Sequence, residues 1–543
     1  MSRSSTALMG TPDELFHWIP GEMVVIVRLP QLPADDTQDV LIEQVRTQLN
    51  EFLAQYSLSL EPYGTYGRWE ENPSMPPVRR RSFIFGVHHK QPFIAIFFHT
   101  RHADPTVRDP LPMALSYLQA HLEHLAQAGL RVVSAMPNWL VTAAPSYYSE
   151  GGPAAPPGPA PSLDVPTPTN ALIGWHLGLV DQYIPLHAGG GEDVMIAILD
   201  TAHHPDRIRS AASRPELRRN WLLQRLAADL RNEDGSFEID YDRYVLTNDV
   251  RTGRNDYNDL RYYLMPDHGL ALAGLVRDLA PRARIRLIRI LNDFGGGDLY
   301  GLFAALTDLE REMVSGSIRH LIINLSLTIM PDIRRLPYIW FDHRQWPTTQ
   351  LPGVMRVLNH IEEGLRLLFS CLYEQGILVV AAAGNDSLNV GQPQGPRPPR
   401  APARYETTLA VSSVNSRFLP SSFSNAANVP PIGSGVATFG GDVAGVLDEN
   451  ALPDAVRVVY ISPNFPGGEQ NSAGWADWRG TSFATPIISA LAAHLMAQKW
   501  SASNIITRLT AGLDSPDTML FGSVPDAPAL LGNIIRVQQR FSL

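Results

Sequence analysis

Apolar positions in the first 144 residues follow two periods, that of strands and that of helices. Apolar runs predict strands, and apolar residues repeating every three to four positions predict helices. The predicted strands are 23–29, 82–89, 92–100 and 130–135, and a first helix is predicted over 37–56. A second helix carries Leu115, Leu118, Leu122 and Leu125 on one face and stops at Gly129. The two middle strands form a hairpin, and the β-α-β-β-α-β order is typical of a small ferredoxin-like α+β domain.

A segment dense in proline, glycine and serine follows at 145–170. Such a composition cannot build a core and favours a semi-extended, exposed linker. It is the clearest domain boundary in the chain. We therefore expect one domain over 1–144, a linker over 145–170 and a second domain over 171–543.

From residue 171 onward, apolar strands alternate with helical patterns. Strands are predicted at 193–200, 283–291, 320–327, 376–385, 408–415 and 436–440, and helices at 268–280, 300–316 and 354–375. Near-continuous apolar strands separated by helices indicate an α/β fold whose mostly parallel sheet is covered by helices on both faces. In such a sheet, functional residues gather at the carboxyl ends of the strands.

Composition narrows the class of protein. A chain of 543 residues with 44% hydrophobic and 18% charged residues is an ordinary globular protein of two domains, and its net charge of -10 argues against a nucleic-acid partner. The single cysteine, Cys371, excludes intramolecular disulfides and lies in a helical pattern typical of a core residue. The N-terminal segment lacks signal-peptide features, and no apolar run reaches the roughly 20 residues of a membrane span. We expect a cytoplasmic protein without a membrane partner, with export by another route left open.

Four polar residues lie at the ends of predicted elements, and each also has an ordinary structural explanation. Asp200 ends a strand, His268 begins a helix, and Asn385 follows a strand after a glycine. Ser482 lies in a Gly-Thr-Ser turn before an apolar helix, where free backbone N–H groups can stabilise an oxyanion. A serine hydroxyl needs a base and an oxyanion site to act as a nucleophile, and histidine is the usual base near pH 7. Taken singly, these signals are weak.

The four residues become a specific signal when the segments of this part of the chain are compared in order. These segments are AILDTAHHPD, HGLALAG, LIINLSL, VVAAAGN and GTSFATP. In this order they resemble the motif series of the subtilisin-like serine proteases, and the resemblance covers 171–530. It implies a subtilisin-like sheet and peptide hydrolysis through a serine acyl-enzyme. The implied roles are nucleophile for Ser482, general base and acid for His268, orienting partner for Asp200, and oxyanion donor for Asn385 together with the Ser482 N–H.

The resemblance also implies a primary specificity pocket. Its matching segments are Ser326-Leu327-Thr328 and Ala382-Ala383-Gly384. Thr328 stands where the family usually has glycine, so it is expected to narrow the pocket or hinder an extended substrate. The substrate specificity of the family is therefore not assigned to this chain. No cofactor is expected to be required. Calcium is common in the family, but the sequence assigns no ligands for calcium or for any other metal.

Other departures flank the reacting groups. Ala202 replaces a usual glycine, and Leu270 and Ala271 replace a threonine and a second histidine. Sixty-seven residues separate Asp200 from His268, and the arginine-rich helical pattern near 214–231 indicates a surface insertion.

The N-terminal domain resembles the propeptide domain that precedes many subtilases and acts as a folding chaperone and inhibitor. Its element order matches, and 136–140 resembles the segment that closes such domains. The alternative is an unrelated ferredoxin-like module. The resemblance implies an intramolecular inhibitor, with maturation cleavage in the proline-rich linker.

Three functions follow from these residues. The first is a subtilisin-like serine endopeptidase acting on proteins or peptides and held in check by its N-terminal domain. The second is a degenerate subtilase that binds peptides or serves as a scaffold, suggested by the altered residues near Asp200 and His268. The third is an esterase with the same acyl chemistry. Parallel peptide and ester assays would separate them.

Overall fold

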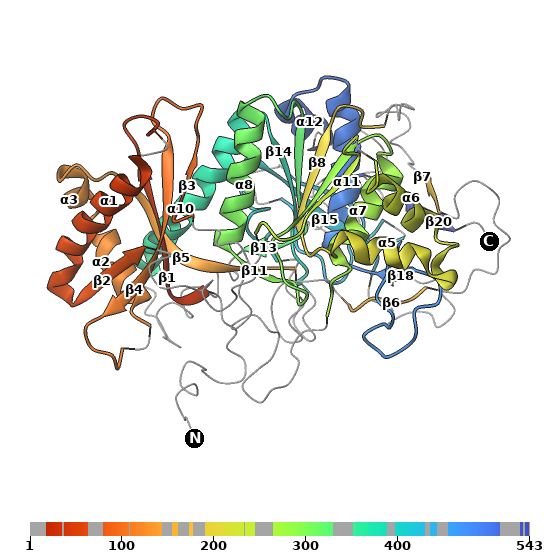
Figure 1. Cartoon of the computed structure of the whole chain (residues 1–543), viewed down its shortest axis with the longest axis horizontal. Coiled ribbons are helices and arrows are strands. Elements are labelled where there is room, and N and C mark those ends of the chain that lie inside the picture. The colour runs from red at the N-terminus through yellow and green to blue at the C-terminus, as the bar shows by residue number, and fades with distance from the viewer. Residues whose placement is uncertain are drawn as a thin grey trace.

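The structure is a computed structural model of the whole chain. It describes residues 18–34, 37–62, 80–107, 109–143, 155–160, 173–176, 190–232, 234–244, 264–329, 351–387, 397–416, 418–428, 435–442, 454–510, 533–535 and 538–541. A small N-terminal sheet with its helices lies at one end of the molecule, beside a larger part built around a second sheet (Figure 1).

The N-terminal sheet is antiparallel. Its strands are β1 (Trp18–Arg28), β2 (Leu58–Pro62), β3 (Ser82–Phe85), β4 (Phe93–His102) and β5 (Val132–Thr142), and its helices are α1 (Gln38–Leu53), α2 (Leu111–Ala120) and α3 (Leu122–Gln127). Strand β1 lies between β5 and β4, and β2 and β3 both pair with the far side of β4. The order along the chain is therefore the expected ferredoxin-like one, with its second strand divided in two.

The predicted hairpin is confirmed, because Phe85 lies opposite Phe93 in the β3–β4 pair. Two other details of the N-terminal domain differ from the prediction. Strand β2 was missed because its five residues form too short an apolar pattern. The second helix is divided at His121, whose backbone leaves the helical region, and Gly129 follows the second piece with a φ of +90°.

The larger part has a parallel sheet as predicted. The order of its main strands is β16-β15-β14-β12-β8-β10, all parallel. Their bounds are β8 (Met195–Asp200), β10 (Arg284–Arg289), β12 (Leu321–Leu325), β14 (Leu378–Ala382), β15 (Thr408–Val414) and β16 (Gly435–Phe439). Two short edge strands that the sequence did not reveal, β9 (Phe237–Asp240) and β19 (Asn533–Ile534), extend the sheet at its ends.

Helices cover both faces of this sheet. Helix α7 (His268–Leu279) packs against α11 (Thr481–Ala497), and both contact strands of the sheet. Helices α8 (Leu299–Val314) and α10 (Leu351–Glu374) lie on the side that meets the N-terminal sheet (Figure 1). These four helices agree with the predicted patterns. The larger part also contains helices α5 (Pro205–Ser213), α6 (Trp221–Asp229) and α12 (Ala502–Thr510).

The surface insertion is only partly exposed. Arg218 and Arg219 face solvent, but Leu222, Leu223 and Leu226 of α6 are buried, and α6 packs against α7. The segment therefore packs against and stabilises the helix that begins with His268. No helix among the described residues is long and apolar enough to cross a membrane.

The N-terminal sheet is joined to the larger part through packing and through capping of α8. Buried apolar residues of both parts form one continuous cluster. Gly364 of α10 lies so close to the sheet that a Cβ there would meet Ile26 Cδ1 at 2.5 Å. Asn138 of β5 is fully buried, accepts a hydrogen bond from the Leu299 N–H at the start of α8, and donates to Glu22 and Asp298. The two parts are therefore in direct contact through apolar packing and buried hydrogen bonds.

Part of the predicted linker is ordered against the larger part. Strand β6 (Gly158–Pro159) pairs antiparallel with β18 (Trp475–Trp478), which in turn pairs with β17 (Val456–Val459). The Trp478 indole N–H donates to Ala155 O at 2.9 Å. Residues 155–160 are thus not a free spacer, while the rest of the linker lies outside the described residues.

Candidate active site

Asp200 and His268 form a buried hydrogen-bonded pair. His268 Nδ1 lies 2.8 Å from Asp200 Oδ1, and both side chains are fully inaccessible to solvent. Asp200 ends β8, and His268 is the first residue of α7. The same carboxylate oxygen accepts the Thr201 N–H at 2.7 Å, which fixes the carboxylate plane. With its Nδ1 hydrogen directed to Asp200, the imidazole presents Nε2 as an acceptor.

Close packing holds α7 against the loop after β8. A Cβ at Gly269 would collide with Thr201 O, so only glycine permits this approach. The Gly269 N–H donates to Thr201 Oγ1 at 3.1 Å. The departures from the family pattern, Ala202, Leu270 and Ala271, are buried core residues. These apolar residues leave every polar group of the Asp–His pair in place.

Ser482 lies at the start of α11. Gly480, with a φ of +148° that glycine tolerates, precedes the helix. Ser482 is 3% exposed, and its Oγ lies 3.4 Å from Ser326 O. Ser326 Oγ in turn donates to Ser482 O at 2.8 Å. The helix start and the end of β12 are therefore tied together at this serine.

The structure brings the histidine close to the serine-bearing turn but not into a hydrogen bond with the serine. The His268 ring makes edge contacts with Trp478 and with Phe483, the residue after Ser482, at centroid distances of 5.3 and 5.4 Å. His268 Nε2 is buried and has no hydrogen-bond partner among the described residues. Catalytic hydrogen bonds are often long or misaligned in the absence of substrate.

Asn385 follows β14 and contacts the same helix start. Its Oδ1 accepts the Thr481 N–H at 2.9 Å and the Thr481 hydroxyl at 3.0 Å. Because the amide is held through its oxygen, its N–H₂ group points away from Thr481. The amide is thereby oriented next to the residue that precedes Ser482.

The two segments assigned to the specificity pocket flank the serine. Ala382, Ala383 and Gly384 are continuous with β14, and the Gly384 N–H donates to Thr481 Oγ1 at 3.3 Å. Ser326, Leu327 and Thr328 lead from β12 into β13 (Thr328–Ile329). Their role as a specificity pocket stays a prediction.

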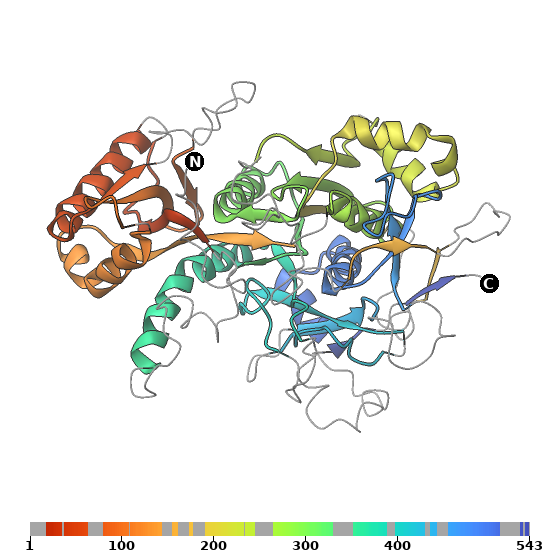
Figure 2. The ribbon, with the colours of Figure 1, turned by 90° about the horizontal axis from the view of Figure 1, so that it is seen from below.

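The last strand of the N-terminal domain lies between two strands of the larger part. Thr142 of β5 pairs with Thr328 of β13 on one side and with Gly296 of β11 (Gly296–Asp298) on the other. The Ala143 N–H donates to Gly295 O at 2.9 Å. Strand β5 leaves the N-terminal sheet and runs into the larger part (Figure 2). An extended backbone therefore fits beside Thr328.

A second acid–histidine pair, which sequence reasoning missed, adjoins the first, because its Asp267 directly precedes His268. His203 Nε2 lies 3.1 Å from Asp267 Oδ1, and both side chains are almost completely buried. Asp267 also accepts hydrogen bonds from the Ile461 and Ser462 N–H groups and from the Ser462 hydroxyl. Burial alone would raise the pKa of Asp267, but His203 and these hydrogen bonds outweigh it, so the pKa lies below its usual value. His203 lies 64 positions before Asp267 in the sequence, so only the fold brings the two side chains together.

Comparison with known proteins identifies the class and the family. The profile of the Subtilase family matches residues 191–511, more than half of the chain. The chain therefore belongs to the subtilase family; it is a serine protease, and its substrates are proteins or peptides. No curated protein matches it.

Two solved structures match the chain. One is a lanthipeptide protease with 18% identity and a TM-score of 0.38, covering 66% of this chain and 90% of that chain. The other is the prenylagaramide maturation protease PagA with 17% identity and a TM-score of 0.34, covering 64% of this chain and 92% of that chain.

Proposed function

We propose that the protein is a serine endopeptidase whose nucleophile is Ser482. The single observation that carries this proposal is the buried His268–Asp200 hydrogen bond beside the helix start that bears Ser482. In this assignment His268 Nε2 takes the hydroxyl proton as Ser482 Oγ attacks the peptide carbonyl, and Asp200 stabilises the imidazolium. The proton then passes to the leaving amine, and water hydrolyses the acyl-enzyme by the same steps.

The oxyanion that forms during attack needs donors that are already in place. We assign this role to the Asn385 amide and the Ser482 N–H at the start of α11. The helix start contributes because its first N–H groups have no partner within the helix. The bond from Thr481 to Asn385 Oδ1 supports the assignment, since it orients the amide before substrate arrives. Preorganised donors of this kind are among the largest contributions to catalysis.

We further propose that the N-terminal domain inhibits the enzyme. Strand β5 pairs with β11 and β13 as an extended peptide, and Thr328 of β13 is two residues from Ser326, which contacts Ser482. A substrate chain in this position would run toward the same serine. The buried Asn138 cap on α8 adds a second point of attachment. We expect the uncleaved chain to have low activity on added substrates.

Turnover of casein tests the assignment of the nucleophile. After release of the N-terminal domain, the wild type should degrade casein and react with phenylmethylsulfonyl fluoride at Ser482. Ser482→Ala should lose both properties, while the control Ser501→Ala, an exposed serine before α12, should keep them. Equal casein turnover by wild type and Ser482→Ala would refute the nucleophile. Peptide binding without turnover by the released wild type would favour the degenerate scaffold, and ester turnover alone would favour the esterase.

A further inference from the structure

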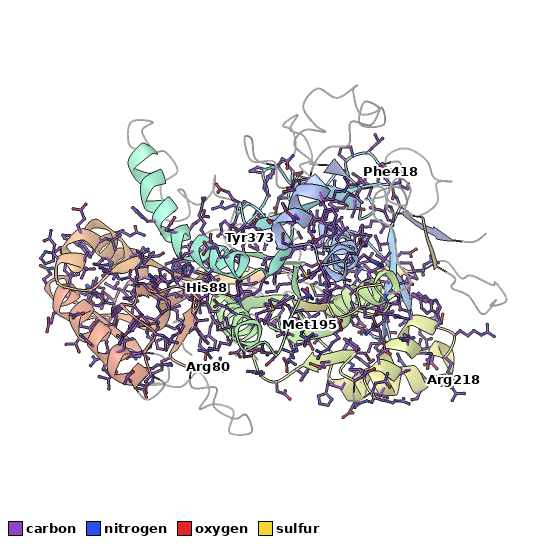
Figure 3. All side chains as sticks on the ribbon, turned by 90° about the horizontal axis from the view of Figure 1, so that it is seen from above. Arg80, His88, Met195, Arg218, Tyr373 and Phe418 are labelled. Carbon is purple, nitrogen blue, oxygen red and sulfur yellow. The ribbon has the colours of Figure 1, made fainter. Side chains whose placement is uncertain are left out.

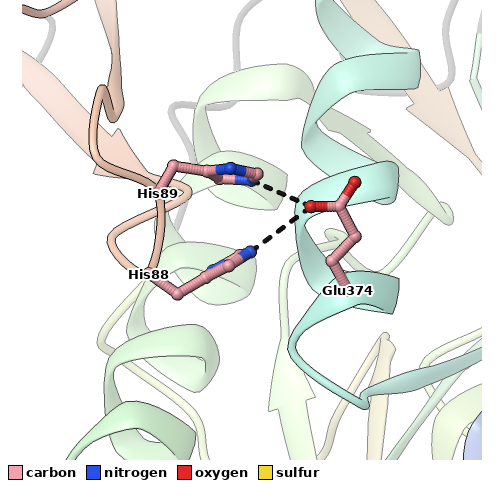
Figure 4. A group of neighbouring side chains, drawn as sticks. All are labelled: His88, His89 and Glu374. Atoms are coloured by element: carbon pink, nitrogen blue, oxygen red, sulfur yellow. Dashed lines mark ion pairs between the residues drawn. The ribbon is translucent and has the colours of Figure 1, made fainter.

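Three side chains with metal-binding atoms converge where the N-terminal domain meets α10. His88 and His89 lie in the turn between β3 and β4, and Glu374 is the last residue of α10 (Figure 4). His89 Nε2 lies 3.1 Å and His88 Nε2 lies 3.6 Å from Glu374 Oε2. In the view of all side chains, His88 lies at this boundary near the end of α10 that carries Tyr373 (Figure 3). The proposed peptidase chemistry uses none of these groups.

We propose that His88, His89 and Glu374 bind one zinc-like divalent cation. One atom from each residue lies within 4.8 Å of the other two. Zinc bonds to histidine nitrogen and carboxylate oxygen are about 2.0–2.2 Å long, so neighbouring ligand atoms of a tetrahedron are about 3.3–3.5 Å apart. The observed separations of 3.1 and 3.6 Å bracket this value. An ion could therefore enter with small side-chain movements.

A buried carboxylate behind His88 supports the assignment. Glu310 of α8 is fully buried and lies 3.6 Å from His88 Nδ1, on the opposite side of the ring from Glu374. Metal-binding histidines commonly direct their second nitrogen to such a carboxylate, which sets the tautomer and the ring orientation. The Gly86 N–H donates to both Glu310 oxygens, at 2.9 and 3.2 Å, and so holds the turn in place.

The chemistry of the donors selects the class of metal. Two imidazoles and one carboxylate suit zinc and similar transition metals, whereas calcium takes six to eight oxygen ligands. Among the described residues, the group offers an ion two imidazoles and one carboxylate, which is far from the six to eight oxygens that calcium requires, and Cys371 Sγ lies 3.6 Å from His89 Nε2. All three side chains keep partial access to solvent, which leaves room for water at the fourth position.

The site would join two parts of the chain that already meet through apolar packing, through the Asn138 cap on α8 and through the pairing of β5 with β11 and β13. His88 and His89 belong to the N-terminal domain, and Glu374 and Glu310 belong to helices of the larger part. An ion bound to all three ligands adds its binding free energy to the stability of this contact. Zinc should therefore hold the N-terminal domain in place.

Metal titration of the full-length Ser482→Ala protein tests the site without self-cleavage. After treatment with a chelator, the protein should bind one equivalent of Zn²⁺ in calorimetry, should give the visible spectrum of four-coordinate Co²⁺, and should not bind Ca²⁺ at the same site. Adding His88→Ala, His89→Ala or Glu374→Gln should weaken Zn²⁺ binding by more than about 100-fold, beyond the usual effect of losing an outer partner. Circular dichroism checks that each variant is folded.

Matched controls come from the same elements. His102→Ala, on β4, and Glu363→Gln, an exposed residue of α10, should bind Zn²⁺ as the parent does. Zn²⁺ should also raise the unfolding temperature of the parent and the controls but not of Glu374→Gln. Absence of binding in the parent, or equal binding in the ligand variants, would mean that the three side chains form ion pairs only and would overturn the proposal.

Discussion

Thr142 of the N-terminal domain lies directly opposite Thr328, the residue that was expected to narrow the specificity pocket or hinder an extended substrate. Thr328 Oγ1 is 3.4 Å from Thr142 O, so the threonine side chain contacts the bound strand. The sequence alone suggested that Thr328 could hinder an extended substrate. The pairing with β5 shows that an extended chain is accommodated there.

Replacing Ala143 with proline should weaken this docked strand. Ala143→Pro removes the N–H that donates to Gly295 O, a bond worth about 1 kcal/mol, or roughly a fivefold change in an equilibrium. We expect a few-fold higher initial rate of peptide hydrolysis by the uncleaved chain and faster amide exchange in β13 of the Ser482→Ala protein. Ala143→Gly keeps the N–H and serves as the control. Matching rates for the two variants would argue against β5 as the inhibitory strand.

Self-cleavage should fall between residues 144 and 154. The chain is held on both sides of this stretch, by β5 through Thr142 and by β6 with Ala155 on the indole of Trp478. A cut between these contacts leaves both of them intact. N-terminal sequencing of fragments should place the cut there in wild type and find none in Ser482→Ala. The same fragment from both proteins would assign the cut to another protease.

Asp200→Asn should keep the fold and lose most activity. The amide can no longer accept the Nδ1 hydrogen of His268 as a carboxylate does, so the tautomer and the stabilised imidazolium are lost. We expect kcat on a peptide substrate to fall on the order of 10⁴-fold with little change in unfolding temperature. Asp206→Asn, at an exposed carboxylate of α5, is the control. A decrease in kcat of less than tenfold would show that Asp200 does not have the assigned role of orienting His268.

Asn385→Ala tests the oxyanion assignment. Loss of one oxyanion donor reduces kcat by about 10²–10³-fold, or roughly 3–4 kcal/mol, with little effect on KM. Because Asn385 also accepts from Thr481, the variant should be checked by circular dichroism. Thr481→Val removes the hydroxyl contact to Asn385 but no oxyanion donor, so a much smaller loss is expected. Equal losses would indicate that Asn385 acts only by holding the turn.

The sequence predicted those features that are encoded locally. The apolar runs that form β8, β12 and β14 and the motif residues Asp200 and His268 lie within short segments, so their patterns can be read directly. Contacts between distant segments could not be read in this way. His203 meets Asp267 across 64 positions, and His88 meets Glu374 across 286. Neither pair forms a motif, because only the packing of α7 and α10 brings them together.

Asp267 should make the active-site region sensitive to acid. Its pKa in the folded protein lies below the usual 3.8, so its ionised form stabilises the fold above that pH, and this stability is lost as the pH falls through the lower folded value. Asp267→Asn replaces the carboxylate that accepts from Ile461 and Ser462 and should lower the free energy of unfolding at pH 7 by about 1.5–3 kcal/mol. Urea unfolding at pH 7 and at pH 3 measures the effect. The difference between wild type and variant should shrink at pH 3, whereas the exposed control Asp206→Asn should match wild type at pH 7. A difference that stays constant between the two pH values would contradict this role for the Asp267 carboxylate.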